Sequence, residues 1–364
     1  MEHPGSQMVD ELVRSGSIKT PPIEAAFRST PRHLFLPGVD PEMVYRDDAI
    51  PIKHGKDGLP TSSSSQPAMM ATMLEQLELS RGHSVLEIGT GSGYNAALLG
   101  AIVGEGGRVR TLDIDDELVA DAQQHLRSAG VSNVQAIAAD GWSGFGGDAP
   151  YDRIEVSVGV WDLSPAWVDQ LAPDGIIVVP LWLRAGVQAS IAFRRDGRDL
   201  ISVHAAPCAF LQLRGPHAGP EAFVPVDGWV LCEDAADSPQ RDQVLRLLET
   251  PATVSEAPHL PDAWFTQVAL SHPTPIRMWT TQEPWVDRQG IMLADRTGLA
   301  VTEAGRILTF GNPKARDELL RFASASSGDL EGVTVHARRT SQPSEATGIS
   351  LARPDFTYSF AWSS

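Results

Sequence analysis

The sequence predicts an α/β protein built on a doubly wound, mostly parallel sheet. Short β-branched runs alternate with helical stretches between Ser84 and Trp182, and a glycine-rich turn follows the first of these runs. The chain has 364 residues, enough for about two domains at roughly 150 residues each. We expect an N-terminal helical and loop segment over residues 1–80, the α/β domain over 81–214, and a smaller α+β domain over 222–364.

Five stretches of the central domain have the length and composition of buried strands. They are Ser84–Gly89, Arg108–Ile114, Asn133–Asp140, Tyr151–Gly159 and Gly175–Trp182. Helical stretches, Gly93–Gly104 and Asp116–Ala129, separate the first three strands. This alternation indicates parallel strands joined by crossover helices. Residues 188–203 then predict a hairpin that turns at Asp196-Gly197 and adds antiparallel strands at one edge.

The clearest domain boundary is Leu213–Pro225, a segment with three prolines. The residues after it mix strand and helix patterns, and they contain five of the nine tryptophans. Ordinary core packing explains these tryptophans, and so does an aromatic surface for a peptide. We expect this second domain to recognise a peptide substrate.

Composition and charge exclude several classes of protein. The 46 acidic residues outnumber the 29 basic ones, and a net charge of −17 argues against a nucleic-acid partner. No apolar run approaches about 18 residues, and the start lacks a signal-peptide pattern, so we expect a cytoplasmic protein without a membrane partner. Cys208 and Cys232 are too few for a disulfide framework or a structural zinc cluster, and we expect no metal. Isolated histidines are interpreted as structural: His33, His54, His204 and His217.

The turn after the first strand has the residues of a ligand-binding loop. It reads Glu87-Ile88-Gly89-Thr90-Gly91-Ser92-Gly93 and opens a helix. Glycines let the backbone turn tightly and approach a ligand at the positive end of the helix. A dinucleotide fingerprint would need glycine at position 94, where the sequence has Tyr94. We therefore expect S-adenosyl-L-methionine rather than NAD, with the candidate cofactor residues Glu87, Gly89, Thr90, Gly91, Ser92 and Gly93.

Two further strand ends carry suitable chemistry for the same cofactor. Asp113 ends the second strand, where a carboxylate can accept hydrogen bonds from both ribose hydroxyls. Asp140-Gly141-Trp142 follows the third strand and supplies an acceptor and an aromatic face for adenine. Either aspartate alone would also fit a helix cap. Because parallel strands end at one edge of the sheet, we add Asp113, Asp140, Gly141 and Trp142 to the candidate cofactor residues.

An ordered series of motifs runs from about residue 20 to residue 214. The motifs are PRHLFLP (Pro31–Pro37), YRDDAIPI (Tyr45–Ile52), Ser65-Gln66-Pro67, LEIGTGSGYNAALL (Leu86–Leu99), AADGWSG (Ala138–Gly144), APYDRIEV (Ala149–Val156) and CAFLQL (Cys208–Leu213). Together they resemble the protein-L-isoaspartate O-methyltransferase family, and the last one resembles the family's VRFVPL strand. The resemblance implies an enzyme that uses S-adenosyl-L-methionine to esterify a peptide carboxylate.

A carboxylate acceptor requires little catalytic machinery. Its pKa is about 4, so it is ionised and nucleophilic at neutral pH without a general base, and the enzyme need only position it. By resemblance, Ser63-Ser64-Ser65 stand where the family has Thr-Ile-Ser, so we assign catalytic roles to Ser63, Ser64 and Ser65. The same segment also fits a polar loop leading to a helix from Pro67 to Leu77, with Ser65 as its N-cap.

Three departures from the family suggest a restricted substrate. The loop after the fourth strand ends in Val160-Trp161-Asp162 where the family has Thr-Ala-Ala-Pro or a similar sequence, and Gln212 replaces a proline. The third departure is the domain after residue 222. We expect substrate contacts from Ser62, Gln66, Val160, Trp161, Asp162 and Gln212.

These departures resemble an actinobacterial branch of the family that acts on ribosomally made, modified peptides (lanthipeptides and related macrocycles). That resemblance implies a macrocyclic precursor peptide as partner and esterification of an aspartate within it. The ester would then collapse to a succinimide (aspartimide) or continue to isoaspartate.

Three alternatives remain open. The first is isoaspartyl repair with an accessory domain, which acceptance of a linear isoaspartyl peptide would favour. The second is methylation of a small-molecule carboxylate, which should not need the second domain. The third is a non-catalytic cofactor-binding module, which should show a damaged glycine loop. The sequence leaves the oligomeric state undecided.

Overall fold

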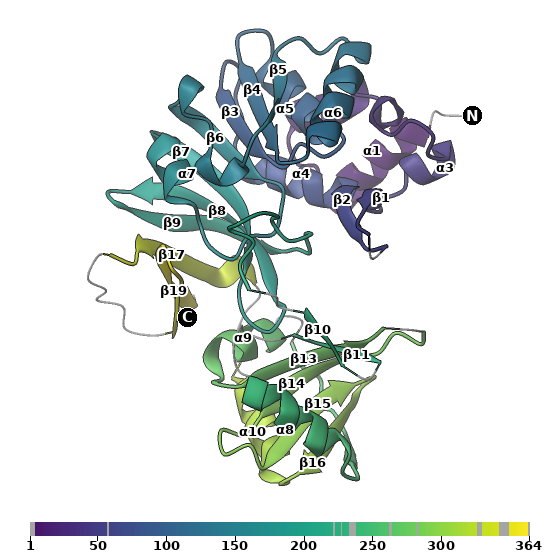
Figure 1. Ribbon diagram of the computed structural model, residues 1–364, viewed down its shortest axis with the longest axis vertical. Helices are drawn as coiled ribbons and strands as arrows, with labels where there is room; N and C mark the ends of the chain where they lie inside the picture. Colours follow the sequence, from purple (N-terminus) through teal and green to yellow (C-terminus); the bar gives the residue numbers. More distant parts are fainter. Residues whose placement is uncertain are drawn as a thin grey trace. The chain divides into compact units, whose positions relative to one another are not determined.

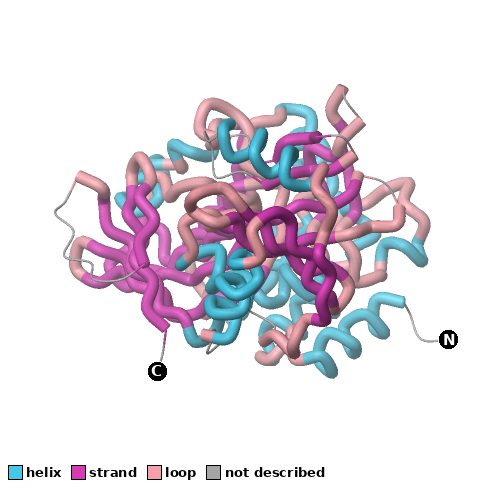
Figure 2. Tube along the Cα trace, turned by 90° about the horizontal axis from the view of Figure 1, so that it is seen from below, coloured by secondary structure: helices cyan, strands magenta, loops and turns pink. Residues whose placement is uncertain are grey.

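The computed structural model of the chain contains two compact units (Figure 1). The first comprises Met1–Pro180, Ser190–His204 and Cys208–Ala218, and the second Leu181–Ala189, Ala205–Pro207 and Gly219–Ser364. The structure describes residues 4–56, 58–220, 223–226, 228–232, 238–261, 264–281, 283–325, 330–341 and 349–362. Figure 2 shows the helices in cyan and the strands in magenta, and both units contain both kinds of element.

The sheet of the first unit has the strand order β5-β4-β3-β6-β7-β8-β9. The strands are β3 (Ser84–Ile88), β4 (Arg108–Asp113), β5 (Val134–Ala138), β6 (Tyr151–Val156), β7 (Leu171–Trp182), β8 (Gln188–Asp196) and β9 (Asp199–Pro207). The first five in this order pair in parallel, which confirms the predicted doubly wound sheet. The chain goes outward from β3 to β4 and β5 and then returns past β3 to β6 and β7. The strand order therefore switches between β3 and β6, and ligands of such sheets bind at the carboxyl ends beside this point.

Helices α5 (Tyr94–Val103) and α6 (Asp116–Ser128) connect β3 to β4 and β4 to β5, as the sequence predicts. The other helices of this unit are α1 (Pro4–Ser15), α2 (Pro21–Ser29), α3 (Pro41–Val44), α4 (Pro67–Gln76) and α7 (Pro165–Gln170), with 3-10 turns at Arg32–Phe35, Gly141–Ser143 and Gly146–Asp148. Side chains of α1, α2, α4, α5 and α6 share one hydrophobic core with the sheet. The N-terminal segment is thus part of the packed unit. No helix among the described residues is long and apolar enough to cross a membrane.

The serine-rich segment predicted as a polar loop is largely a strand. β2 (Pro60–Ser64) pairs antiparallel with β1 (Ile50–His54), and Ser63 lies opposite Pro51 in this hairpin. Successive side chains of a strand point to opposite faces, so Ser63 and Ser64 face different sides. Ser64 is buried, whereas Ser63 is half-buried.

The predicted N-cap of α4 is also wrong. The helix begins after Gln66 rather than Ser65, and the Gln66 side chain makes no capping hydrogen bond. Asp47 supplies the cap instead, because its Oδ1 accepts from the backbone N–H of Ala68 at 2.8 Å. Its Oδ2 accepts from Nε2 of Gln66 at 2.9 Å. A residue about twenty positions upstream therefore caps the N-terminus of α4. Local sequence spacing alone does not reveal such a cap.

A buried guanidinium holds the base of the hairpin. Arg32 is 0% exposed. It donates to the carbonyl oxygens of Val44, Arg46, Asp48 and Ser65 and to the hydroxyl of Ser64. The shortest of these bonds, to Ser65, is 2.9 Å long. Arg32 therefore ties the end of β2 to the segment that precedes β1.

The strand predicted at Cys208–Leu213 is not formed. Gln212 makes an isolated parallel bridge with Gly159, through backbone bonds from Gly159 N–H to Leu211 and from Leu213 N–H to Gly159, each 2.8 Å. The pairing stops there because the next N–H, of Val160, donates to Pro180 at 2.9 Å.

The second unit is an α+β assembly, as predicted. An antiparallel sheet has the order β10-β11-β13-β14-β15-β16-β12. Its strands are β10 (Phe223–Val226), β11 (Trp229–Cys232), β12 (Thr253–Glu256), β13 (Pro275–Thr280), β14 (Asp287–Met292), β15 (Gly298–Glu303) and β16 (Arg306–Gly311). The unit also contains β17 (Val333–Arg339), β18 (Ile349–Ala352), β19 (Phe356–Trp362), α8 (Ser238–Leu248), α9 (Trp264–Ser271), α10 (Lys314–Ser324) and a 3-10 turn at Leu330–Gly332. β19 pairs antiparallel with both β17 and β18.

Candidate functional site

The glycine loop after β3 leaves its backbone open to a ligand. Gly89 has φ of 103°, and a Cβ there would lie 3.0 Å from Cγ1 of Val158. Gly91 has φ of 51°, and a Cβ there would lie 3.5 Å from the carbonyl oxygen of Ser63. Positive φ favours glycine at both positions. The loop thus passes directly beside the serine hairpin, so the structure brings the predicted cofactor and substrate segments together.

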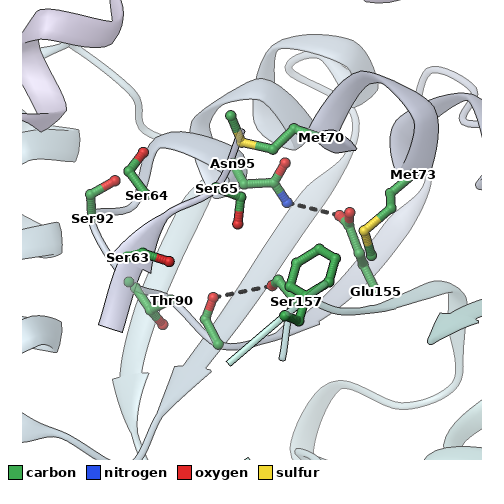
Figure 3. Close-up of a pocket in the computed structure, with 13 residues that line it drawn as sticks. Ser63, Ser64, Ser65, Met70, Met73, Thr90, Ser92, Asn95, Glu155 and Ser157 are labelled. Atoms are coloured by element: carbon green, nitrogen blue, oxygen red, sulfur yellow. Dashed lines mark hydrogen bonds between the residues drawn. The ribbon is translucent and has the colours of Figure 1, made fainter. Parts of the chain in front are cut away.

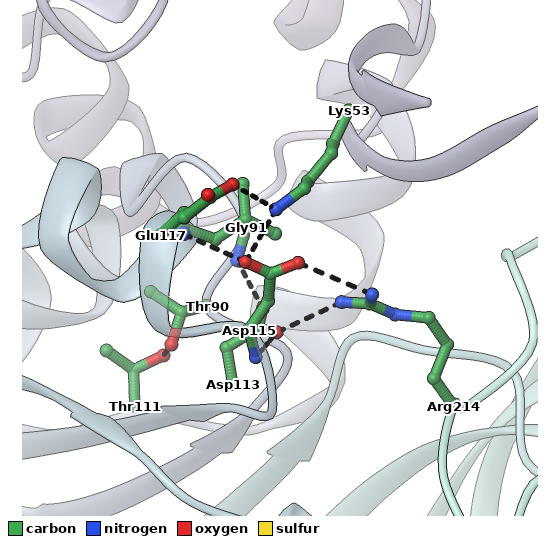
Figure 4. A network of polar contacts seen from close by, with 9 residues as sticks. Lys53, Thr90, Gly91, Thr111, Asp113, Asp115, Glu117 and Arg214 are labelled. Atoms are coloured by element: carbon green, nitrogen blue, oxygen red, sulfur yellow. Dashed lines mark hydrogen bonds and ion pairs between the residues drawn. The ribbon is translucent and has the colours of Figure 1, made fainter. Parts of the chain in front are cut away.

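Asp113, at the end of β4, is directed at this loop (Figure 4). Its Oδ2 accepts from the N–H of Gly91 and its Oδ1 from the N–H of Asp115, both at 3.1 Å. The side chain is 9% exposed, and burial raises the pKa of the Asp113 carboxyl above its usual value despite these donors. Each carboxylate oxygen can accept more than one hydrogen bond, so the group retains capacity for ligand hydroxyls.

The neighbouring acid has a different role. Asp115 caps α6 by accepting from the N–H of Leu118, and its carboxylate forms an ion pair with Nζ of Lys53 at 2.8 Å. The same ammonium contacts Glu117 at 2.7 Å. Because Lys53 belongs to β1, this ion-pair cluster fastens the serine hairpin to the β4–α6 turn (Figure 4). No local pattern predicts this role for Lys53, since its partners are about sixty residues away along the chain.

The third strand end combines a cap with an aromatic surface. Oδ1 of Asp140 accepts from the N–H of Trp142 at 3.0 Å, and Nε1 of Trp167 donates to the carbonyl of Gly141 at 2.7 Å. Asp140 therefore caps the turn at Gly141–Ser143, and its role in cofactor binding stays a prediction. Asp140 and Trp142 are half-buried and Gly141 is buried.

A segment that the sequence suggested only as a domain boundary lies against these strand ends. Arg214 is 3.4 Å from carboxylate oxygens of both Asp113 and Asp115. The ring of His217 stacks on Trp142 with centroids 4.5 Å apart and an angle of 3°. Arg214 and His217 are therefore further candidate cofactor-site residues, although His217 was interpreted as structural. No local motif marks them.

Beside the glycine loop lies a pocket of about 400 Å³, including solvent at its mouth (Figure 3). It is lined by Ser63, Ser64, Ser65, Met70, Met73, Gly89, Thr90, Gly91, Ser92, Asn95, Glu155, Ser157 and Phe210. No lysine, arginine or histidine is among these described lining residues. Ser64 is buried and accepts from Arg32 at 3.4 Å, whereas Ser63 and Ser65 are half-buried and more accessible to a ligand.

Two buried glutamates and an asparagine lie together beside this pocket. Glu87 is 0% exposed and Glu155 1% exposed. Nδ2 of Asn95 donates to Oε1 of Glu87 at 2.7 Å. The same nitrogen donates to Oε2 of Glu155 at 2.9 Å (Figure 3). Burial raises the pKa of both carboxyls. Glu87 is among the residues predicted from the sequence and Glu155 is not, although a glutamate within a predicted buried strand is a usable signal.

The predicted substrate residues are dispersed. Ser62 lies near Gly91, its Oγ 3.8 Å from where a Cβ would be, while Gln66 is exposed and bonded to Asp47. Val160 and Asp162 are buried, at 0% and 3% exposure, and neither they nor Trp161 line the described pocket. Gln212 donates through Nε2 to the carbonyl of Ala218 and so holds the segment that carries Arg214 and His217.

Comparison with known proteins places this geometry in a family. The sequence profile described as Protein-L-isoaspartate(D-aspartate) O-methyltransferase matches residues 3–217. A protein-L-isoaspartate O-methyltransferase of Ignicoccus hospitalis is 34% identical over 213 residues, which are 58% of this chain and 98% of that protein. One from Pyrococcus horikoshii is 37% identical over 214 residues, 57% of this chain and 92% of that protein.

Two solved structures share the fold. One described as a protein-L-isoaspartate O-methyltransferase has a TM-score of 0.57 and 24% identity, and the match covers 99% of both chains. Another, a candidate member of the same family from Plasmodium falciparum in complex with S-adenosyl-L-homocysteine, has a TM-score of 0.51 and 20% identity over 59% of this chain and 99% of that one.

The fold and these matches define an S-adenosyl-L-methionine-dependent methyltransferase. More narrowly, the chain belongs to the protein-L-isoaspartate O-methyltransferase family, whose members methylate (iso)aspartyl carboxylates. The expected enzyme class and cofactor are thereby confirmed. The individual site residues stay predictions.

We predict that Asp113→Asn weakens binding of S-adenosyl-L-homocysteine by about tenfold or more, because charge-assisted hydrogen bonds contribute about 1.5–3 kcal/mol each. Isothermal titration calorimetry measures this change. The matched control is Asp121→Asn, an exposed acid on α6, which should bind as the wild type does. An unchanged dissociation constant for Asp113→Asn would remove this residue from the cofactor site.

The buried glutamates predict an unusual dependence of stability on pH. Unfolded glutamate titrates at about pH 4.3, whereas burial raises the pKa of Glu87 and Glu155 in the fold. The unfolded chain therefore loses these protons first, and the pair's contribution to the free energy of unfolding falls as pH rises above about 4.3 toward the folded pKa values. Urea unfolding at several pH values should show a smaller decline for Glu155→Gln, while the exposed Glu105→Gln should follow the wild type. Parallel curves for Glu155→Gln and wild type would refute the raised pKa.

Proposed function

We propose that this chain is a protein-L-isoaspartate O-methyltransferase that esterifies the carboxylate of isoaspartyl residues in polypeptides. The family match over residues 3–217 carries this proposal, because it spans the complete α/β unit and the serine hairpin. The pocket between the glycine loop and that hairpin supplies the chemistry.

The residues of the site fit the cofactor. The glycine loop would hold its amino-acid end, Asp113 its ribose, and Asp140-Gly141-Trp142 its adenine. Two buried polar atoms beside the pocket, Oε2 of Glu87 and Oδ1 of Asn95, have no hydrogen-bond partner, as expected where a polar ligand binds. When bound, S-adenosyl-L-methionine supplies an electrophilic methyl group attached to a sulfonium.

The protein's own contribution is to position the acceptor. An isoaspartyl carboxylate is ionised at neutral pH, so no side chain has to remove a proton. Hydroxyls of Ser63 and Ser65 donate to the carboxylate and align one oxygen with the methyl carbon. Neither serine gains or loses a proton overall.

The ester is chemically activated for the next step. Esterification removes a negative charge and creates methanol as a leaving group, so the following backbone nitrogen can attack and close a succinimide. Hydrolysis of that ring returns aspartate or isoaspartate. The methyltransferase site need not catalyse this step.

A second candidate substrate is a genuine aspartate in a constrained, ribosomally made peptide. The half-buried Trp161 favours it, since this loop has small residues in the family to which the chain belongs. The other differences from the family pattern, at Ser64, at Gln212 and in the second unit, give less support to this second candidate. Ser64 and Gln212 have intramolecular partners, and a solved chain described as a protein-L-isoaspartate O-methyltransferase matches this fold over 99% of both lengths. We place peptide recognition in the second unit, where Trp285 is 68% exposed.

Three synthetic peptides distinguish these functions: a linear isoaspartyl peptide, the same peptide with aspartate, and a macrocyclic aspartyl peptide. Each is incubated with enzyme and S-adenosyl-L-methionine and followed by mass spectrometry. We expect the mass gain of one methyl ester on the isoaspartyl peptide alone. Methylation of the macrocycle alone, followed by loss of methanol, would instead establish the second candidate.

Replacing Ser63 and Ser65 together by alanine should lower kcat by about tenfold or more with little change in S-adenosyl-L-homocysteine affinity. Each lost hydroxyl removes a hydrogen bond to a charged acceptor, worth about 1.5–3 kcal/mol. Steady-state kinetics and calorimetry measure the two quantities. Ser128→Ala, at an exposed position on α6, is the control. A parallel loss of turnover and cofactor affinity would make the hairpin a cofactor element.

A further inference from the structure

Two carboxyl groups face each other at the point where the strand order of the sheet switches. Glu87 on β3 and Glu155 on β6 are direct partners in the parallel register. Both receive hydrogen bonds from the same amide nitrogen, Nδ2 of Asn95. The two carboxyls are therefore close neighbours on one face of the sheet.

The surroundings do not neutralise these carboxyls. Neutral groups face them from α4 (Met70, Met73), from α5 (Asn95), from β4 (Thr111) and from the residue after β6 (Ser157). A further acid, Asp113, also raises the pKa of Glu87 by like-charge repulsion. The nearby arginines are engaged elsewhere: Arg32 binds the carbonyls at the hairpin base, and Arg153 binds those of Leu77, Glu78 and Asp152. Two buried anions without a cation are strongly unfavourable, so this arrangement requires a positive charge or a retained proton.

The acceptor atoms that remain match one kind of ligand group. Oε2 of Glu87 and Oδ1 of Asn95 are buried without a partner. Glu155 lines the pocket and accepts its one described hydrogen bond through Oε2, which leaves Oε1 for a ligand. Three acceptors, two of them on carboxyl groups, suit a primary ammonium, which has three N–H donors and a positive charge.

We propose that Glu155 is a cofactor-positioning residue that, with Glu87 and Asn95, binds the α-ammonium group of the cofactor's amino-acid end. This inference rests on the proposed function, which supplies a ligand with such a group. Without cofactor, the pair retains one proton. When the ammonium binds, that proton leaves to water, and the ammonium replaces it as the neutralising charge.

The consequence is that cofactor binding is linked to proton release. Burial raises the pKa of both carboxyls, so the retained proton is present under near-neutral conditions. As pH rises, the proton is lost beforehand and the ammonium binds a site already ionised. The affinity for S-adenosyl-L-homocysteine should therefore increase with pH across the range in which the pair titrates.

Calorimetry of the wild-type protein tests this directly, in buffers with different enthalpies of ionisation. S-Adenosyl-L-homocysteine should release up to one proton per site near neutral pH. 5′-Methylthioadenosine, which has the same nucleoside but no amino-acid end, should release none. Equal proton release by the two ligands, or none by either, overturns the inference even where S-adenosyl-L-homocysteine binds well. A protein that binds neither ligand overturns the proposed function as well.

A matched pair of variants identifies the residue. Glu155→Gln keeps the shape of the side chain and removes its charge, so S-adenosyl-L-homocysteine should bind about tenfold more weakly at slightly alkaline pH and release fewer protons. Its affinity for 5′-methylthioadenosine should not change, which also shows that the variant is folded. Glu105→Gln, an exposed glutamate after α5, should behave as the wild type does. If Glu155→Gln binds S-adenosyl-L-homocysteine and releases protons as the wild type does, Glu155 does not belong to the site. If the variant does not fold, the comparison of the two ligands on the wild-type protein decides the proposal.

Discussion

The geometry of the pocket depends on the burial of one guanidinium, that of Arg32. Its two terminal nitrogens make five described hydrogen bonds. Four of these go to backbone carbonyls, three at separate positions before the hairpin and one after it. A buried charge without such partners would cost several kcal/mol, so these segments can only fold together. The arrangement fixes the end of β2 and, with it, Ser63 and Ser65 beside the glycine loop. An exposed serine-rich loop would become ordered only when substrate binds, whereas the end of β2 is already held in place by Arg32.

The second determinant is the pair of adjacent strands β3 and β6. Their carboxyl ends carry the glycine loop and Ser157, and their shared face carries the two glutamates. Strands in the middle of a parallel sheet are usually apolar on both faces. Polar groups there lower the stability of an empty protein, and a ligand that satisfies them stabilises the folded state in proportion to its concentration. Stability and cofactor occupancy are therefore coupled through this face of the sheet.

Much of the α/β unit could be predicted from its sequence. The alternation from Ser84 to Trp182 identified β3 to β7 and the helices α5 and α6, because β-branched runs and glycine turns are local signals. The strand β2 was missed for the same reason, since its three consecutive serines carry no strand preference and its anchors, Arg32 and Lys53, lie outside this segment. The 208–213 strand was predicted from resemblance and failed because only Gly159 was available as a partner.

The site was harder to predict where its members come from distant segments. Glycine turns and strand-end aspartates are local signals, so the sequence predicts both Gly91 and Asp113 for the site, and their contact at 3.1 Å follows from the topology. Arg214 and His217 follow the last matched motif, in a proline-rich segment whose composition indicates a linker. Pairing between distant segments was equally hard to predict in the second unit. There β12 pairs with β16, which follows it by some fifty residues and three strands along the chain.

The hairpin has two anchors of different physical kinds. At its base, Arg32 is buried and bound to carbonyl dipoles, which added salt does not screen appreciably. Toward its other end, Lys53 is 29% exposed and its partner Glu117 is 84% exposed, so that contact lies within reach of counterions. The Debye length falls from about 10 Å at 0.1 M salt to about 3 Å at 1 M. High ionic strength should thus weaken the contact between Lys53 and Glu117 while leaving Ser64 and Ser65 in place, so the two ends of the hairpin differ in their sensitivity to salt.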